Sequence, residues 1–331
     1  MDKRKAIFMK DKTIINTLSQ GFTQRTDLAL EMREMVCGDA SPDLDGIESN
    51  KEKRNGIIID TIKVTSDEGA KKLGKPIGTY ITIDIGQIWQ YSEDKFLSVC
   101  DICAEYLSGL IPKKASCLLA ALGNRAITAD SQGPLCAESF IVTRHIKEYS
   151  AELFRELGLC ETACIVPDVL GNTGVEAANI VKGVAQKIKP DFIIAVDSLA
   201  SRKTSRLATT LQMSDTGIAP GSGVGNHRMA LNQETLGIPV IAIGIPTVVD
   251  AATVGADVLD EYLREQGEEL TEKVRSHILE AVLKNGSFNY FVTPKNADAI
   301  SKSAARLIAL SVNKALNPDL SYGDMTELCC K

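Results

Sequence analysis

Two aspartates stand where a carboxylate could do chemistry. Asp197 directly follows the most apolar run of the chain, residues 192–196, where a low dielectric would raise its pKa. Asp130 lies in the polar segment that follows another apolar run, residues 117–122. Because loops after parallel strands project from the same edge of a sheet, the two carboxyl groups can meet. The pattern favours a pair that shares one proton, with one member acting as base on water and the other as acid.

A structural interpretation of these aspartates stays open. Asp197 could cap a following helix and Asp130 could stabilise a turn, and spacing alone does not separate these roles from catalysis. Other chemistries have weaker support. The glycine-dense segment 214–228 has neither a phosphate-binding spacing nor a nucleophile elbow around Ser222, and His227 lies outside any H-E-x-x-H motif.

The elements that must position the pair follow from short apolar runs that alternate with helical stretches. This alternation is typical of a parallel sheet covered by helices on both faces, so we predict an α/β fold with a mostly parallel central sheet. Thr173 and Glu176 have the spacing of a capping box before one of the helices. Four runs are the predicted parallel strands, and two further β-branched segments predict an extra antiparallel region: 117–122, 163–167, 192–197 and 238–246, then 56–64 and 78–85.

Composition limits the class of protein. The chain has 331 residues, 44% of them hydrophobic, nine cysteines and a formal net charge of −6, without a long basic run. We therefore expect a soluble cytoplasmic protein in a reducing compartment, with no nucleic-acid partner and no membrane span.

Segment 38–56 is polar and predicts an exposed loop. Cys100 and Cys103 form a C-x-x-C, yet they recur with helical apolar spacing, which favours core packing over redox chemistry.

Several long strings of this sequence resemble the germination (spore) protease family. In chain order they are "RTDLALE" (25–31), "GKPIGTYITIDI" (74–85), "LGNRAITADSQGP" (122–134), "VTRH" (142–145), "GNTGVEAANI" (171–180), "KPDFIIAVDSLASR" (189–202), "QMSDTGIAPGSGVGNHR" (212–228) and "LGIPVIAIGIPTVVDA" (236–251). The resemblance covers the chain from about residue 25 to beyond residue 250.

The resemblance implies an endopeptidase that cuts small acid-soluble spore proteins in the spore core during germination. It implies an atypical aspartic mechanism on Asp130 and Asp197 without a cofactor or metal, a fold similar to hydrogenase maturation proteases, and a homotetramer. By the same carry-over, five further residues are expected to line the substrate cleft: Asn124, Arg125, Arg202, Asp215 and His227.

The resemblance also implies a zymogen that removes its own leader. Residues 1–24 would be the propeptide, and residues 25–331 a single α/β protease domain. The chain departs from the family pattern at Asp168, where glycine is favoured, and at Ala129 and Ser131, where proline and alanine are usual. Asp168 would perturb the pKa of the pair or cap a turn.

Two alternatives to the aspartic endopeptidase stay open at this stage. One is a metal-dependent endopeptidase of the maturation type, which would require ligands near Asp197. The other is a non-catalytic module that binds a spore protein, and it would tolerate neutralisation of both aspartates.

Overall fold

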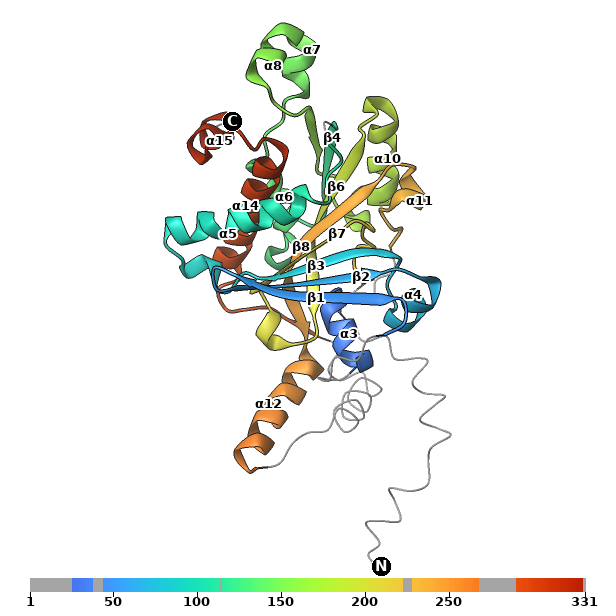
Figure 1. Ribbon diagram of the computed structural model, residues 1–331, viewed down its shortest axis with the longest axis vertical. Coiled ribbons are helices and arrows are strands. Elements are labelled where there is room, and N and C mark those ends of the chain that lie inside the picture. Colours follow the sequence, from blue (N-terminus) through green and yellow to red (C-terminus); the bar gives the residue numbers. More distant parts are fainter. Residues whose placement is uncertain (1–25, 38–43, 114, 223–227, 268–289, 330–331) are drawn as a thin grey trace, which may run out of the picture.

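A mixed nine-stranded sheet organises the chain. The computed structural model describes residues 26–37, 44–113, 115–222, 228–267 and 290–329 (Figure 1). The strands, in chain order, are β1 (Ile47–Arg54), β2 (Ile57–Val64), β3 (Gly78–Asp84), β4 (Cys117–Ala121), β5 (Thr162–Ile165), β6 (Phe192–Ser201), β7 (Thr210–Ser214), β8 (Val240–Asp250) and β9 (Phe291–Val292). Their order in the sheet is β1-β2-β3-β7-β8-β6-β4-β5, and β9 pairs with β8.

The parallel part of the sheet is its β8-β6-β4-β5 section, and the remaining pairings are antiparallel. Strands β4 and β6 are buried along both faces, which explains their nearly continuous apolar sequences. The predicted α/β class, with a parallel centre and an added antiparallel region, is therefore confirmed. The antiparallel region is larger than the two predicted strands, because β1 and β7 belong to it.

Helices cover the sheet. In chain order they are α3 (Ala29–Cys37), α4 (Asp67–Leu73), α5 (Glu93–Ser108), α6 (Gln132–Glu138), α7 (Arg144–Tyr149), α8 (Ala151–Leu157), α9 (Leu170–Thr173), α10 (Ala177–Ile188), α11 (Gln233–Leu236), α12 (Ala251–Glu265), α14 (Ala297–Leu316) and α15 (Tyr322–Cys329). Helices α5, α6 and α14 lie on one face of the parallel strands, and α10 and α11 on the other (Figure 1).

Alternation along β6 divides the core between these two faces. Phe192, Ile194 and Val196 pack in the cluster with α5, α6 and α14, whereas Ile193 and Ala195 pack in the cluster with α10 and α11. A third cluster joins α3 and α4 to strands β1 to β3. By the same alternation, Asp197 shares the α10 face of its strand.

Two local predictions are wrong. Residues 47–54, predicted within an exposed loop, form β1, an edge strand whose outer side chains are charged and exposed, so that its sequence resembles a loop. Thr173 does not cap a helix; it ends α9, and α10 begins at Ala177 after an N-cap at Glu176 that has no side-chain cap bond. Gly174, with φ +70°, separates the two short helices.

The C-x-x-C segment is part of the core, as predicted. Cys100 and Cys103 are fully buried on α5, and burial raises the pKa of the Cys103 thiol to about 12. Such thiols are poor nucleophiles.

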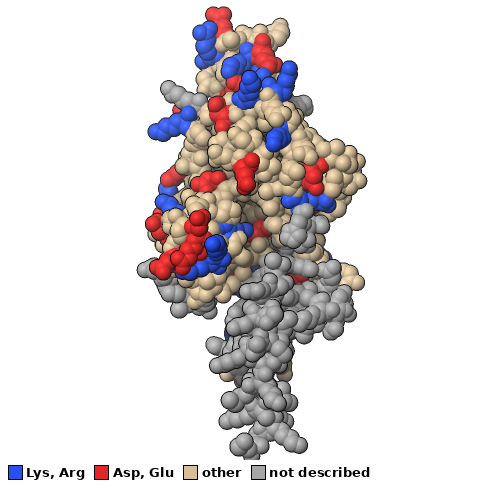
Figure 2. Space-filling view, turned by 90° about the vertical axis from the view of Figure 1, so that its right-hand side faces the viewer, with Lys and Arg blue, Asp and Glu red and all other residues tan. Residues whose placement is uncertain are grey.

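No helix in the described part of the chain is long and apolar enough to cross a membrane. On the face drawn in Figure 2, lysines and arginines are interspersed with acidic side chains rather than gathered in one patch.

Candidate active site

Asp197 lies near the carboxyl-terminal end of the parallel section of the sheet. It is opposite Gly244 in the β6–β8 register and is 5% exposed. Strand β4 stops one position earlier, because its last pairing is Ala121 with Val196 and the Leu122 amide then donates to the Val196 carbonyl at 2.8 Å. Asp197 is therefore held within β6, which continues past the end of the neighbouring strand β4.

Asp130 is the last residue of a short 3-10 turn, Thr128–Asp130, in the loop after β4. Its Oδ2 atom accepts a hydrogen bond from the Asn124 amide at 2.9 Å, which closes the loop. Gly123 makes this closure possible, since it has φ +112° and a Cβ there would lie 2.1 Å from the Asp130 carbonyl oxygen.

Strand β8 fastens this loop from the other side. The Gln132 side chain donates to the Ile245 carbonyl at 2.8 Å and accepts from the Ile245 amide at 3.1 Å, so it pairs with the strand as a backbone would. The Thr247 hydroxyl donates to the Ala129 carbonyl at 2.5 Å. The loop that carries Asp130 is thus joined to the strand that pairs with Asp197.

The two aspartates are close enough for their charges to interact. Burial raises the pKa of Asp197 well above its ordinary value, and the charges of Asp130 and Asp27 raise it further. Burial also raises the pKa of Asp130 to about 6, with a contribution from the Asp168 charge and an opposing one from the Asn124 amide. Two carboxyl groups with raised pKa values that repel each other favour a state with one proton.

Three of the expected cleft residues lie on segments that adjoin the pair. Asn124 contributes its backbone amide to Asp130, while its side chain accepts from the Ala126 amide at 2.9 Å. Arg125 is exposed and forms an ion pair with Glu138. Arg202 is 8% exposed and follows the end of β6, where its amide donates to a Glu31 carboxylate oxygen at 2.6 Å.

Asp215, a fourth expected residue, is not brought to the pair. Asp215 accepts from the Thr79 amide at 2.7 Å and so fixes the start of β3. Ser214 is paired with Ala242, which is level with Ala195, so Asp215 lies further toward the opposite edge of the sheet than Asp197. His227 lies outside the described residues, as do Arg25 and the predicted leader.

Asp27 is a third carboxylate at the site, and sequence reasoning missed it. Its charge raises the pKa of Asp197, and its side chain accepts from the Ala200 amide at 2.8 Å and from the Ser222 hydroxyl at 2.7 Å. The only signal was its place in "RTDLALE", which neither periodicity nor strand ends connect with Asp197.

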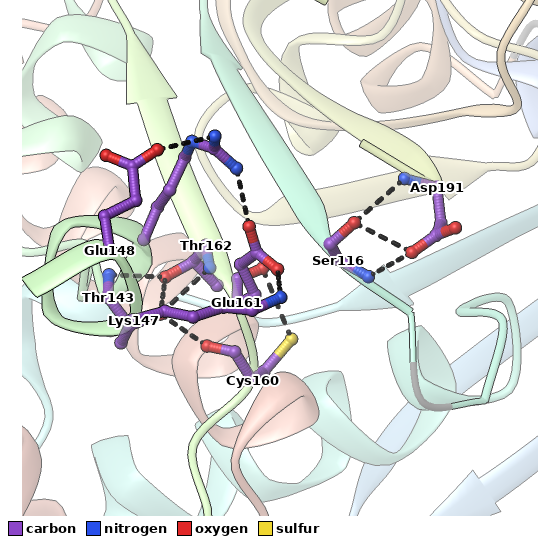
Figure 3. A network of polar contacts seen from close by, with 9 residues as sticks. Ser116, Thr143, Lys147, Glu148, Cys160, Glu161, Thr162 and Asp191 are labelled. Carbon is purple, nitrogen blue, oxygen red and sulfur yellow. Dashed lines mark hydrogen bonds and ion pairs between the residues drawn. The ribbon is translucent and has the colours of Figure 1, made fainter. Parts of the chain in front are cut away.

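The opposite edge of the same strands is built differently (Figure 3). There, Glu161 accepts from Arg144 at 2.6 Å and pairs with Lys147, and Asp191 accepts from the amide and the hydroxyl of Ser116 at 2.7 and 2.8 Å. The bonds from Ser116 hold the pKa of Asp191 below its ordinary value, despite a small opposing effect of burial. The Asp191 carboxylate is therefore kept ionised.

Within the described ranges, no group of three or more His, Cys, Asp or Glu side chains is arranged to hold a metal ion.

Comparisons with known proteins agree with the sequence resemblance. The family model described as "Germination protease" matches residues 24–279. The chain belongs to the germination protease family. A germination protease of Caldanaerobacter subterraneus subsp. tengcongensis is 39% identical, with 92% of this chain and 97% of that protein covered. One from Clostridium acetobutylicum is 38% identical, with 92% and 98% covered. Family membership makes the chain a peptidase.

A solved structure gives a weaker likeness. A [NiFe] hydrogenase maturation protease HycI from Thermococcus kodakarensis KOD1 aligns with 62% of this chain and 98% of its own, at 16% identity and a TM-score of 0.31. The α/β fold class follows from the strand pairings described above.

Asp168, which departs from the family pattern, occupies a left-handed backbone conformation with φ +62°. Glycine adopts this conformation without strain, and Asp is among the few other residues that tolerate it. Its Oδ1 atom accepts from the Val169 amide at 2.7 Å and from Asn172 at 3.0 Å. Asp168 therefore stabilises its turn and also raises the pKa of Asp130, so both expected roles apply.

Proposed function

We propose that this chain is the endopeptidase that cuts small acid-soluble spore proteins during germination, by an atypical aspartic mechanism, and that it acts as a homotetramer in the spore core. One observation carries the mechanism. Asp130 and Asp197 project from adjoining segments at one edge of the sheet, where burial and mutual repulsion disfavour two negative charges. A carboxylate pair of this kind is what activation of water for peptide hydrolysis requires.

The two environments assign the roles. Asp197 is the more buried member and holds the shared proton, whereas Asp130 is ionised above about pH 6. Asp130 takes a proton from water as the water oxygen bonds to the scissile carbonyl carbon, and Asp197 donates its proton to the carbonyl oxygen. Collapse of the tetrahedral gem-diol breaks the C–N bond as one hydroxyl returns its proton to Asp197 and re-forms the carbonyl. The leaving amine takes the proton held by Asp130, so both carboxyl groups return to their starting states.

The leader belongs to the same proposal. Residues 1–24 form a propeptide whose removal converts the zymogen to the active enzyme. The support is positional: Asp27, the third residue after the boundary, is anchored to the strand that carries Asp197, since the Asp27 amide donates to the Ala200 carbonyl at 3.0 Å. The boundary is therefore only a few residues along the chain from a segment held beside the pair.

Mass spectrometry of a purified small acid-soluble spore protein incubated with the processed chain, which begins at Arg25, tests the mechanism. Discrete fragments should form with and without a chelator, and they should disappear with Asp197→Asn and with Asp130→Asn. Fragments that the chelator abolishes would favour the metal-dependent alternative. Fragments that persist in both variants would move catalysis to other residues, and intact substrate throughout would favour a binding module.

N-terminal sequencing of active enzyme from sporulating cells tests the zymogen. A new terminus near Gln24 or Arg25 is expected, and it should be absent from the Asp197→Asn chain if the leader is self-cleaved. Active enzyme that still begins at Met1 would contradict the leader proposal.

A further inference from the structure

We infer that Asp27 is a positioning residue of the carboxylate pair, which fixes the backbone after Asp197 and sets a second negative charge beside it. The inference rests on the proposed function, because it gives Asp27 a role toward the same pair. It goes beyond that proposal by making the first residues after the leader a structural part of the site.

The first observation is an open edge of β6. Strand β4 pairs with β6 only as far as Val196, yet β6 continues to Ser201. Among the described residues, no strand pairs with the backbone beyond Asp197 on that side. Unpaired buried amide and carbonyl groups destabilise a fold. Asp27 fills the gap, because its amide donates to the Ala200 carbonyl at 3.0 Å and its Oδ2 atom accepts from the Ala200 amide at 2.8 Å.

The second observation is that Glu31 also bonds to the backbone that has no strand partner. Its carboxylate is fully buried and accepts from the amides of Arg202 and Lys203 at 2.6 and 2.8 Å. Thr26 donates its hydroxyl to the same carboxylate. Side chains of the segment 26–31 thus replace the missing strand along the backbone that follows Asp197.

The third observation concerns how Asp27 itself is held. Its carbonyl accepts from Lys75 and from Gln212, both at 2.9 Å, and the Gln212 side chain also accepts from the Ala29 amide at 2.7 Å. The segment therefore docks on β7 and on the turn before β3 as well as on β6. A residue fixed from three sides can hold another group in place.

Asp27 also acts on Asp197 through its charge. The groups that act on Asp197 are Asp130, from the loop after β4, and Asp27; Lys75 acts on Asp27 from the turn after α4, and Asp168 acts on Asp130. Asp27 is accordingly the second negative charge that favours retention of the proton by Asp197. Neutralising it should ease ionisation of Asp197.

Asp27→Asn separates charge from geometry. The amide oxygen can still accept from Ala200, and the amide nitrogen can donate to the Ser222 hydroxyl, which rotates to accept. Asp27→Ala removes both bonds. Glu68→Gln is the matched control, since it neutralises an exposed carboxylate of the neighbouring helix α4 that pairs with Lys72 at 2.9 Å.

The experiment measures two properties of the processed chain, which begins at Arg25. One is the pH dependence of kcat/KM on a small acid-soluble spore protein. The other needs no activity: carbon NMR of aspartate-labelled protein, in which the Asp197 carboxyl signal is recognised by its absence from Asp197→Asn. In Asp27→Asn, the basic limb of the profile and the Asp197 titration should both move to lower pH, with KM unchanged.

Asp27→Ala should also lower kcat by about 100-fold, because displaced catalytic groups cost rate even when chemistry and binding groups remain. Glu68→Gln should match the wild type in both measurements. An Asp27→Asn chain whose profile and Asp197 titration equal those of the wild type would overturn the inference. Full activity of Asp197→Asn would instead overturn the proposed function, so the two failures are distinguishable.

Discussion

The two ends of the parallel strands treat carboxylates in opposite ways. At the amino-terminal edge, Asp191 and Glu161 are matched by donors and cations, namely Ser116, Arg144 and Lys147 (Figure 3). At the carboxyl-terminal edge, Asp130, Asp197 and Asp27 lie near one another, and Asp130 and Asp197 accept hydrogen bonds from backbone amides. The amino-terminal edge stabilises negative charge, whereas the carboxyl-terminal edge disfavours it.

The difference shows how a fold reserves chemistry for one edge. A carboxylate that accepts several hydrogen bonds is stable in its ionised form and does not bind a proton at neutral pH. A buried carboxylate with few donors binds a proton and can release it again. The same strands supply both edges. Burial and the number of nearby donors and cations, rather than residue type, therefore decide whether a carboxylate at an edge can exchange a proton.

The largest effect is expected from neutralising one aspartate at each edge. Asp197→Asn should lower kcat/KM for spore-protein cleavage by about 10³-fold or more, the scale of a lost acid–base group. Asp191→Asn should leave kcat/KM within about twofold, because a paired surface carboxylate contributes little. Steady-state kinetics on the two variants checks this, and comparable losses would remove the distinction between the edges.

A glycine at each edge tests packing. Gly244→Ala would put a Cβ 2.2 Å from the Asp197 carbonyl oxygen, and we expect a loss of about 3 kcal/mol in the free energy of unfolding. Gly158→Ala, at the end of α8 with φ +63° and open space around it, should cost about 1 kcal/mol. Urea unfolding measures both, and equal losses would show that the Asp197 edge is not tightly packed.

The pH dependence of stability should have opposite signs at the two edges. Burial raises the pKa of Asp130 to about 6, so its neutral form favours folding, and this contribution is lost as pH rises from about 4 through 6. Relative to Asp130→Asn, the wild type should lose about 2 kcal/mol over that range.

The pKa of Asp191 is lowered by Ser116, so its ionised form favours folding, and that contribution is lost as pH falls below about 4. Unfolding of the wild type and of the Asp130→Asn and Asp191→Asn variants from pH 3 to 8 measures both slopes. Slopes of the same sign would contradict the comparison.

The smallest effect is expected from Ser116→Ala. It removes the hydroxyl from Asp191 but leaves the amide, so stability should fall by about 1 kcal/mol and peptidase activity should not change. Thermal unfolding and the cleavage assay check it together. A loss of activity would mean that the amino-terminal edge supports the site at a distance.

Much of the fold could be predicted because the parallel strands are buried on both faces. Their apolar runs are long, and each run is followed by polar residues, so the polar segments could be assigned to one edge. The end of β6 was misplaced, however, because the strand continues through Asp197 to Ser201. Strand β1 could not be predicted, since a charged edge strand has no apolar face in its sequence. The short β7 strand, Thr210–Ser214, was missed because a run of five residues shows little periodicity.

The pair Asp130 and Asp197 could be predicted from strand ends, but the supports around it could not. Gln132 and Thr247 contact the loop and strand through long-range bonds between segments more than 100 residues apart. Asp27 lies far from Asp197 in the sequence and reaches it through a gap in strand pairing. Asp215 shows the reverse case, since its polar segment follows a strand that runs antiparallel to β8.

One irregularity in the sheet also fixes a length. The β6–β8 register runs from Leu199–Pro246 to Ala200–Val248, so Thr247 is an extra residue on β8. Deleting it would make the pairing regular, yet it would also remove the hydroxyl that holds the Asp130 loop. The residue count between Val240 and Asp250 is thus as much a part of the site as any side chain in it.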